Sequence, residues 1–346
     1  MNRRTPAALL ALATFALLLP SQDEVRRPAP QPTQPGVRLT YELPVDTLQR
    51  QLQRTPDQDL EQVLAGIVRT MQARLGALGT VTRHQATGFT IDIQEASPEV
   101  LARVERRVAI AGRLEMWIVA DGRYREADLA LEQEQKHLLA WLADGNRERV
   151  QKDPRAVADL PRRERSQVRW VPRVIRPHQA AGQPGRWHHP LSKMGGDPFR
   201  YVVPVFDEGQ WNGGAVPVAM QNADDPFLVE LVPLNLHAAS FSDRDLDGDK
   251  IAIGAGRNGR PAIRYTLLAD RRRAYADWSG RFTGSASGVV LDGVLVTAPV
   301  FLSKIPGAGI LEGDYSRRQA EDLVSVLKSR GLPAAPQLVA KEALRD

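Results

Sequence analysis

Apolar and polar residues alternate along residues 37–43, which is the period of a half-buried β-strand. Residues 60–75 then place apolar side chains three or four positions apart, as one buried face of a helix requires. Thr55 is a good N-cap, Pro56 suits the first helical position, and Gln58 completes a capping box. We therefore expect a strand followed by a helix that begins near residue 55.

The pattern continues to residue 120 with two short strands, around residues 80–83 and 89–94. Ser97 opens a second helix, and residues 114–118 alternate again as a fourth strand. The order β-α-β-β-α-β is the split arrangement of ferredoxin-like folds. Residues 37–120 are therefore expected to form one ferredoxin-like domain that contains all four strands.

Residues 121–195 have a different character. A helix is expected over residues 129–142, with Gly145 as its end. Arginine and proline then become frequent and acidic residues few, so we expect a long basic insertion with little regular structure. The segment 121–195 is accordingly predicted to be a charged helix followed by a partly disordered loop.

A second module is expected over residues 196–340. Asp292 and Gly293 separate two apolar runs and form its clearest hairpin turn, because both residue types tolerate positive φ. Ser316 and Gln319 then cap a final helix. The predicted fold class is α+β, with two ferredoxin-like (split β-α-β) modules joined by the basic insertion. Further strands are expected at 199–206, 227–236, 250–253 and 262–268, and a helix at 271–282.

The N-terminus resembles a secretory signal. Arg3 and Arg4 precede an apolar run over residues 7–19, which is shorter than a membrane-spanning helix needs. We expect a signal peptide over residues 1–22 and a proline-rich tether over 23–36. The protein is then periplasmic or secreted, with an uncleaved N-terminal anchor as the alternative.

The composition excludes several kinds of site but does not identify a binding partner. The chain has 346 residues, 42% hydrophobic residues and a formal net charge of +5, which suits a globular protein of about two domains. It contains no cysteine, which excludes disulfides, thiolate metal sites and cysteine nucleophiles. The mild positive charge names no partner by itself.

Four ordered features in the last hundred residues form a recognisable set. They are the hairpin segment Val289–Val300, which contains Ala298-Pro299, then Ile305-Pro306-Gly307, a capped helix, and Gly331-Leu332-Pro333-Ala334. This set resembles the first periplasmic domain of the SecD family of protein translocase subunits. The helix of residues 61–78 and its glycine-rich end are similar to the base subdomain of that family.

The resemblance implies a base-like domain over 37–120 and a head-like domain over 196–340. Asp292, Gly293, Ala298 and Pro299 are then structural residues of the hairpin turn and the strand exit. The family's head subdomain is thought to hold emerging polypeptide. Its membrane motor has no counterpart in the apolar pattern of this sequence, so we do not expect a proton-driven translocase from this chain alone.

Four acidic residues suggest a metal site. Asp243, Asp245 and Asp247 fall at positions one, three and five of a calcium-loop pattern, and Asp249 follows. Position twelve is Gly254 where such loops carry a bidentate glutamate. Two interpretations stay open: a solvated acidic turn, which the missing glutamate favours, and a calcium site.

The basic insertion offers two further candidates. His178, His188 and His189 are ligand types for zinc, although a surface loop is the favoured interpretation. Trp170 and Trp187 among the arginines suggest a polyanion partner. A solvated charged loop is the favoured interpretation of this stretch. Because the export signal argues against nucleic acid, an anionic membrane surface is the alternative.

Two short segments resemble catalytic or cofactor-binding motifs, but neither has the spacing and neighbouring elements that its motif requires. Ser285–Gly288 lacks the G-x-S-x-G spacing of a nucleophile elbow. Gly254–Gly259 has the G-x-G-x-x-G spacing, but a strand follows it where a dinucleotide site needs a helix, so a hairpin loop is expected. The predicted function is a non-catalytic, cofactor-free extracytoplasmic protein that binds polypeptide or a protein-export partner. The alternatives are an envelope structural or calcium-binding module and, with less support, a hydrolase on the same scaffold.

Overall fold

The computed structural model describes most of the chain beyond the N-terminus. The predicted signal and tether lie outside the described residues except for Gly36, and so do Thr55, Pro56 and Gln58. No helix in the described residues is long and apolar enough to cross a membrane. The described ranges are 36–54, 59–85, 87–123, 130–175, 177–178, 186–187, 190–207, 227–256, 259–312 and 316–344.

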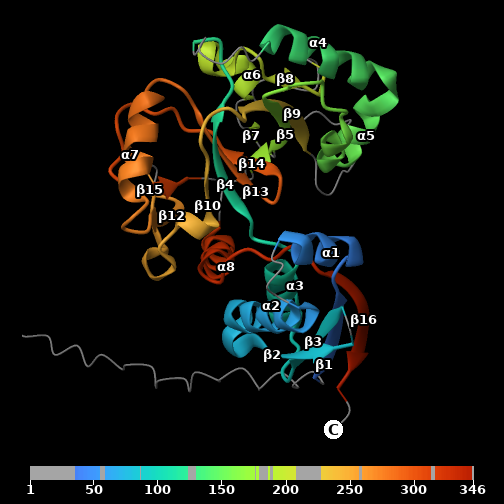
Figure 1. Ribbon diagram of the computed structural model, residues 1–346. Helices are drawn as coiled ribbons and strands as arrows, with labels where there is room; N and C mark the ends of the chain where they lie inside the picture. Colours follow the sequence, from blue (N-terminus) through green and yellow to red (C-terminus); the bar gives the residue numbers. More distant parts are fainter. Residues whose placement is uncertain are drawn as a thin grey trace, which may run out of the picture.

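The first domain is an antiparallel sheet packed against helices (Figure 1). Leu39, Phe89 and Ile91 from the sheet are buried against Leu64 and Met71 of one helix. The strand order is β16-β1-β3-β2, which is the ferredoxin-like order. Its elements are β1 (Val37–Glu42), α1 (Val45–Arg54), α2 (Leu60–Leu75), β2 (Thr80–His84), β3 (Gly88–Ile93), α3 (Pro98–Val108) and β16 (Gln337–Ala343).

Local capping decides where α2 starts. The helix begins at Leu60, because Asp59 accepts a hydrogen bond of 2.7 Å from the Gln62 amide and the Gln62 side chain accepts one from the Asp59 amide. The expected start near residue 55 was therefore wrong. The structure also contains α1, which the sequence pattern did not reveal. At the start of α3, the predicted Ser97 caps the helix as expected.

The fourth strand of this domain comes from the other end of the chain. Residues Leu114–Val119 form β4, which belongs to a different sheet, and β16 takes its place beside β1. The prediction of a complete domain within residues 37–120 was wrong on this point. The physical reason is that alternation identifies a strand and its buried face but not the strand with which it pairs.

The next unit is a small closed barrel. The strands β4, β13, β14, β5 and β9 pair in that order, and β9 returns to β4 through Ile118 and Asn235. Its interior holds Val119, Val232 and Leu295. Closure removes the free strand edges. The bounds are β5 (Val168–Ile175), β9 (Leu228–Asn235), β13 (Ser287–Leu291) and β14 (Val294–Thr297), with β8 (Val203–Pro204) and β10 (Phe241–Ser242) added at the margins.

A buried carboxylate closes one end of this barrel. Glu230 on β9 is fully buried and pairs with Arg173 at 2.8 Å. Its oxygens also accept hydrogen bonds from the amides of Leu191 and Ser192. These amides begin the short helix α6 (Leu191–Met194), so Glu230 fixes α6 against the barrel.

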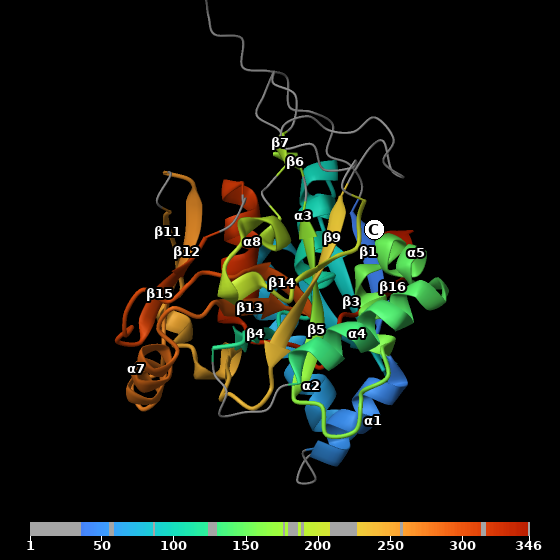
Figure 2. The same cartoon turned by 90° about the horizontal axis from the view of Figure 1, so that it is seen from above.

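The segment expected to be a partly disordered insertion is largely ordered where it is described. Two helices, α4 and α5, cover the outside of the barrel (Figure 2). Leu138 and Val150 from them pack on Trp170 and Val229. As the sequence predicted, Gly145 ends the first of these helices: its φ of 77° is non-helical, and α5 begins after the kink. The bounds are α4 (Leu131–Trp141), α5 (Arg147–Lys152), a 3₁₀ turn (Pro154–Asp159), β6 (Pro177–His178) and β7 (Arg186–Trp187).

The last unit is a three-stranded sheet with an aromatic core. Phe241, Tyr275, Trp278 and Phe301 pack together in edge and tilted contacts. This unit is not a second ferredoxin-like module, because its sheet has the order β11-β12-β15 and its other predicted strands belong to the barrel. Its elements are β11 (Ala252–Ala255), β12 (Pro261–Thr266), α7 (Arg272–Arg281), β15 (Ala308–Leu311) and α8 (Arg317–Lys328).

The predicted turn at the tip of the β13–β14 hairpin has the expected backbone. Asp292 has φ of 50° and Gly293 has φ of 83°. A Cβ added at Gly293 would meet no atom within 4 Å, so only backbone strain opposes an alanine there.

Gly293→Ala is therefore expected to lower the free energy of unfolding by about 1 kcal/mol. The matched control is Gly66→Ala, in the interior of α2 with equally open space, which is expected to raise stability by up to about 1 kcal/mol. Urea denaturation of both variants measures the effect. Equal shifts of the same sign in the two variants would contradict the turn conformation.

Candidate functional site

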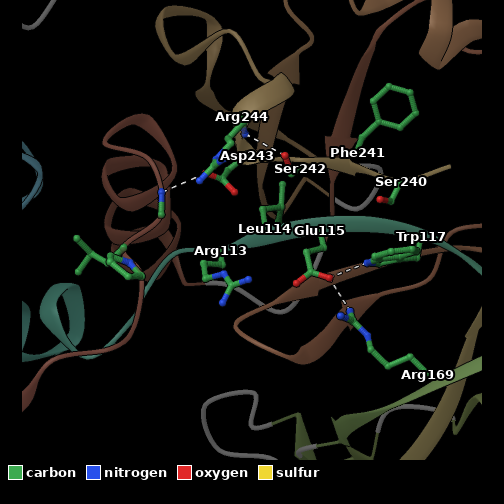
Figure 3. Close-up of a pocket in the computed structure, with 13 residues that line it drawn as sticks. Arg113, Leu114, Glu115, Trp117, Arg169, Ser240, Phe241, Ser242, Asp243 and Arg244 are labelled. Carbon is green, nitrogen blue, oxygen red and sulfur yellow. Dashed lines mark hydrogen bonds and ion pairs between the residues drawn. The ribbon is translucent and has the colours of Figure 1, made fainter. Parts of the chain in front are cut away.

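A cavity of about 640 Å³ opens where the three units meet (Figure 3). Its walls come from β4, β10 and the following turn, the start of β5, and the segment 331–333. The segment 331–333 lies between α8 and the returning strand β16, so the cavity borders the first domain as well. Figure 3 shows the side chains of its wall grouped around β4.

One wall of the cavity is a compact ionic group on β4 and β5. The carboxylate of Glu115 accepts hydrogen bonds from Trp117 Nε1 at 2.7 Å and from Arg169 Nη2 at 2.6 Å (Figure 3). The Arg169 guanidinium lies 5.2 Å from the centre of the Trp117 ring. This wall is therefore rigid, and its negative charge is neutralised.

Next to this group, the cavity lining carries unbalanced positive charge. Asp243 accepts a hydrogen bond of 3.1 Å from the Gly331 amide. Arg113 and Arg244 are exposed, and within the described part of the chain neither guanidinium forms an ion pair. The cavity thus offers two free guanidinium donors, which suit carboxylate or carbonyl oxygens.

A fully buried arginine fixes the backbone segments beside this site. Arg74 on α2 donates hydrogen bonds to the carbonyls of Ile110, Ala111 and Arg330 and to the hydroxyl of Ser329. Burial lowers the pKa of the Arg74 guanidinium to about 10, against the opposing charges of two nearby aspartates. The carbonyls of Ile110 and Ala111 lie between α3 and β4, and that of Arg330 lies between α8 and β16. One side chain therefore joins the two segments that connect the first domain to the rest of the chain.

The hairpin turn contributes to the same junction. The carboxylate of Asp292 accepts hydrogen bonds from the amides of Gly112 at 3.1 Å and Arg113 at 2.9 Å. The Asp292 amide donates to the Arg113 carbonyl at 3.0 Å. Asp292 therefore positions Arg113 in the cavity wall, a role beyond the turn that the sequence suggested.

Helix α8 is attached to the first domain by a second ionic cluster. Asp322 is buried and lies 2.8 Å from Arg107, 3.1 Å from Arg106 and 3.3 Å from Arg103, all on α3. Arg107 also donates to the carbonyl of Arg74 at 2.7 Å. The two arginine clusters are thus linked, and together they seat α8 on α2 and α3.

The four candidate calcium ligands face separate partners. Asp245 accepts a hydrogen bond from the Ser242 amide at 2.8 Å and lies 2.6 Å from Arg271. Asp247 binds Lys250 at 2.7 Å, and this hydrogen bond lowers the pKa of Asp247. Asp249 is exposed, and Asp243 faces the cavity. Within the described residues no three His, Cys, Asp or Glu side chains group as a metal site.

The remaining motifs suggested by the sequence lie in strands or in the buried core, or outside the described residues. Gly254 lies in β11, which pairs antiparallel with β12 (Pro261–Thr266), as the expected hairpin requires. Ser285 is fully buried and donates to Asp121 at 2.8 Å. His178 lies in β6, whereas His188 and His189 fall outside the described residues.

Ala298 and Pro299 follow the hairpin where they were expected. Ala298 packs against the barrel interior, and the Pro299 carbonyl accepts a hydrogen bond of 2.8 Å from the Ser287 amide. This bond ties the strand exit back to β13. Both residues therefore contribute to the barrel rather than to the cavity.

The described residues thus combine a ferredoxin-like domain, a small barrel and an aromatic three-stranded unit around one polar cavity. Residues 234–334 match the family described as the SecDF P1 head subdomain. They include both the β10 turn and the segment 331–333 of the cavity wall.

Parts of the chain are also similar to curated relatives and to a solved structure. The chain is 28% identical over 138 residues to protein translocase subunit SecD of Aquifex aeolicus, covering 40% of this chain and 23% of the relative. It is 35% identical over 78 residues to SecD of Rhodobacter capsulatus, covering 22% and 14%. A solved structure of SecDF in its super-membrane-facing form has 16% identity and a TM-score of 0.48, covering 88% of this chain and 30% of that one.

Residues 234–334 therefore match the SecDF P1 head subdomain, and the chain is distantly similar to SecD over part of its length. The chain spans at most 23% of the length of the two relatives named above.

Proposed function

We propose that this protein binds unfolded polypeptide during protein export, without catalysis, in the periplasm or outside the cell. The polar cavity at β4 and β10 is the binding site. The observation that carries the proposal is that the head-subdomain match includes the part of the cavity wall bearing Arg244, beside a second free guanidinium on Arg113. Unfolded chains expose backbone carbonyls and carboxylates, which are the acceptors that free guanidinium groups bind.

The rigid wall supports this role. Trp117 and Arg169 present a fixed aromatic and cationic surface on which an apolar or carbonyl group can lie. Because Arg74 and Asp292 fix the backbone around Arg113, the cavity is preformed and little ordering entropy opposes binding. The N-terminal sequence, with its signal-like apolar run, supports the location.

The double variant Arg113→Glu with Arg244→Glu is expected to weaken binding of a dye-labelled, permanently unfolded protein by about tenfold at low salt. Fluorescence anisotropy measures the affinity. The matched control is Arg69→Glu with Arg317→Glu, two exposed arginines on α2 and α8 outside the cavity. Equal losses in both double variants would indicate only a general charge effect and would overturn the assigned site.

The partner is tested in the native envelope. A photo-crosslinking amino acid at Ser240, in the cavity wall, is expected to capture exported chains or translocase subunits identified by mass spectrometry. The same group at Glu132, exposed on α4, is the control. Recovery of only envelope structural proteins from both positions would argue against an export role.

A further inference from the structure

A second, smaller cavity of about 330 Å³ lies on another side of the barrel. It is framed by the 3₁₀ turn Pro154–Asp159, the loop that follows it, strand β5 and the hairpin turn at Asp292 and Gly293. Arg169 lines both cavities, so they are neighbours on β5. Much of the wall of the smaller cavity comes from residues before 234, outside the head-subdomain match.

The floor of this cavity is apolar and buried. Val157, Val168 and Trp170 line it, each less than a tenth exposed. The indole Nε1 of Trp170 is buried and has no hydrogen-bond acceptor among the described residues. The floor therefore suits a large apolar group.

The rim carries cations without matching acids. Arg155 and Arg162 are exposed and form no ion pair within the described ranges. The two acids in the wall are already engaged: Glu134 with Arg163 at 3.0 Å, and Asp292 with backbone amides. Arg155 Nε donates only a long hydrogen bond of 3.4 Å to the Asp292 carbonyl. A carboxylate that entered the rim would therefore meet two guanidinium groups without a carboxylate partner and no opposing free charge.

We propose that this cavity binds an acidic-apolar peptide motif, with a large apolar side chain on the Trp170 floor and an adjacent carboxylate between Arg155 and Arg162. The inference rests on the proposed function only in that both ligands are polypeptide. Its site is separate. A volume near the lower end for ligand pockets fits one anchoring side chain, and cations set above a buried apolar floor fit a side chain beside a carboxylate better than a flat membrane surface.

The test uses the full chain and a short dye-labelled peptide that contains Phe-Asp-Glu, with a Phe-Asn-Gln peptide as its control. Arg162→Glu is expected to weaken binding of the acidic peptide by about tenfold, whereas Arg69→Glu on α2 leaves it unchanged. Ala158→Trp, an exposed position in the cavity wall, is expected to block binding without changing any charge.

A spectroscopic readout locates the peptide. The indole N–H resonance of Trp170, assigned by its loss in Trp170→Phe, is expected to shift when the acidic peptide binds the wild-type protein and to stay fixed in Ala158→Trp. Equal binding of the neutral peptide, or equal losses in Arg162→Glu and Arg69→Glu, would overturn the proposal. Full displacement of the peptide by phosphatidylglycerol vesicles that themselves shift the Trp170 resonance would assign the cavity to lipid instead.

Two variants and two ligands distinguish this second site from the cavity of the proposed function. The Arg113→Glu and Arg244→Glu double variant is expected to keep acidic-peptide binding while it loses unfolded-protein binding. Arg162→Glu is expected to show the reverse preference. Loss of both activities in both variants would mean a single extended surface and would overturn the separate second site.

Discussion

Replacing Arg74 with methionine is expected to lower the free energy of unfolding by about 3–5 kcal/mol. The side chain is fully buried and donates to three carbonyls and one hydroxyl. Methionine keeps the apolar stem but leaves those acceptors without a donor, and each buried unpaired acceptor costs about 1–3 kcal/mol. Chemical denaturation of the full chain measures the loss.

Two controls separate the lost hydrogen bonds from the change of residue type. Arg69→Met, exposed on the same helix, is expected to change stability by less than about 0.5 kcal/mol. Arg74→Lys keeps the charge but not the planar fork, so an intermediate loss is expected. If Arg74→Met were as stable as Arg69→Met, the two segments that connect the first domain to the rest of the chain would not depend on this guanidinium.

The second large effect is expected at Asp322. Asp322→Asn keeps the shape of the side chain but removes the charge that faces three arginines, of which Arg107 is also buried. We expect a loss of about 3 kcal/mol, because an uncompensated buried cation remains. The neighbouring control is Glu321→Gln, whose partly exposed pairs are expected to contribute less than about 1 kcal/mol.

The two clusters are expected to be coupled. Arg107 contacts both Asp322 and the Arg74 carbonyl, so the effects of Arg74→Met and Asp322→Asn should not add. A double-mutant cycle in urea measures this coupling. Additive losses within about 0.3 kcal/mol would show that the clusters act independently.

The sites differ in how visible they are in the sequence. Arg74 lies three residues after Met71 and directly before Leu75, inside an apolar stripe, and a cation in such a stripe is a signal of a buried polar junction. Arg113 and Arg244 carry no comparable signal, because isolated exposed arginines are common on any surface. Only their placement across one cavity makes them candidates for binding.

The sequence by itself determined the elements whose causes are local. The turn at Asp292 and Gly293, the capping box of Ser316 and Gln319, and the alternation in β12 depend on residues close together in the chain, so short-range physics is sufficient for them. The order of motifs around that hairpin also carried the resemblance to SecD, which the head-subdomain match supports.

The tertiary structure alone decided which elements meet. Strand β4 could complete either sheet by its pattern, and burial of Leu114 against the aromatic core, together with the return of β16 beside β1, placed it in the barrel. The ordering of β5 depends on its packing against α4 and α5, since both its faces are buried and its sequence does not alternate. Such choices depend on contacts between residues well separated in the chain, which no local period encodes.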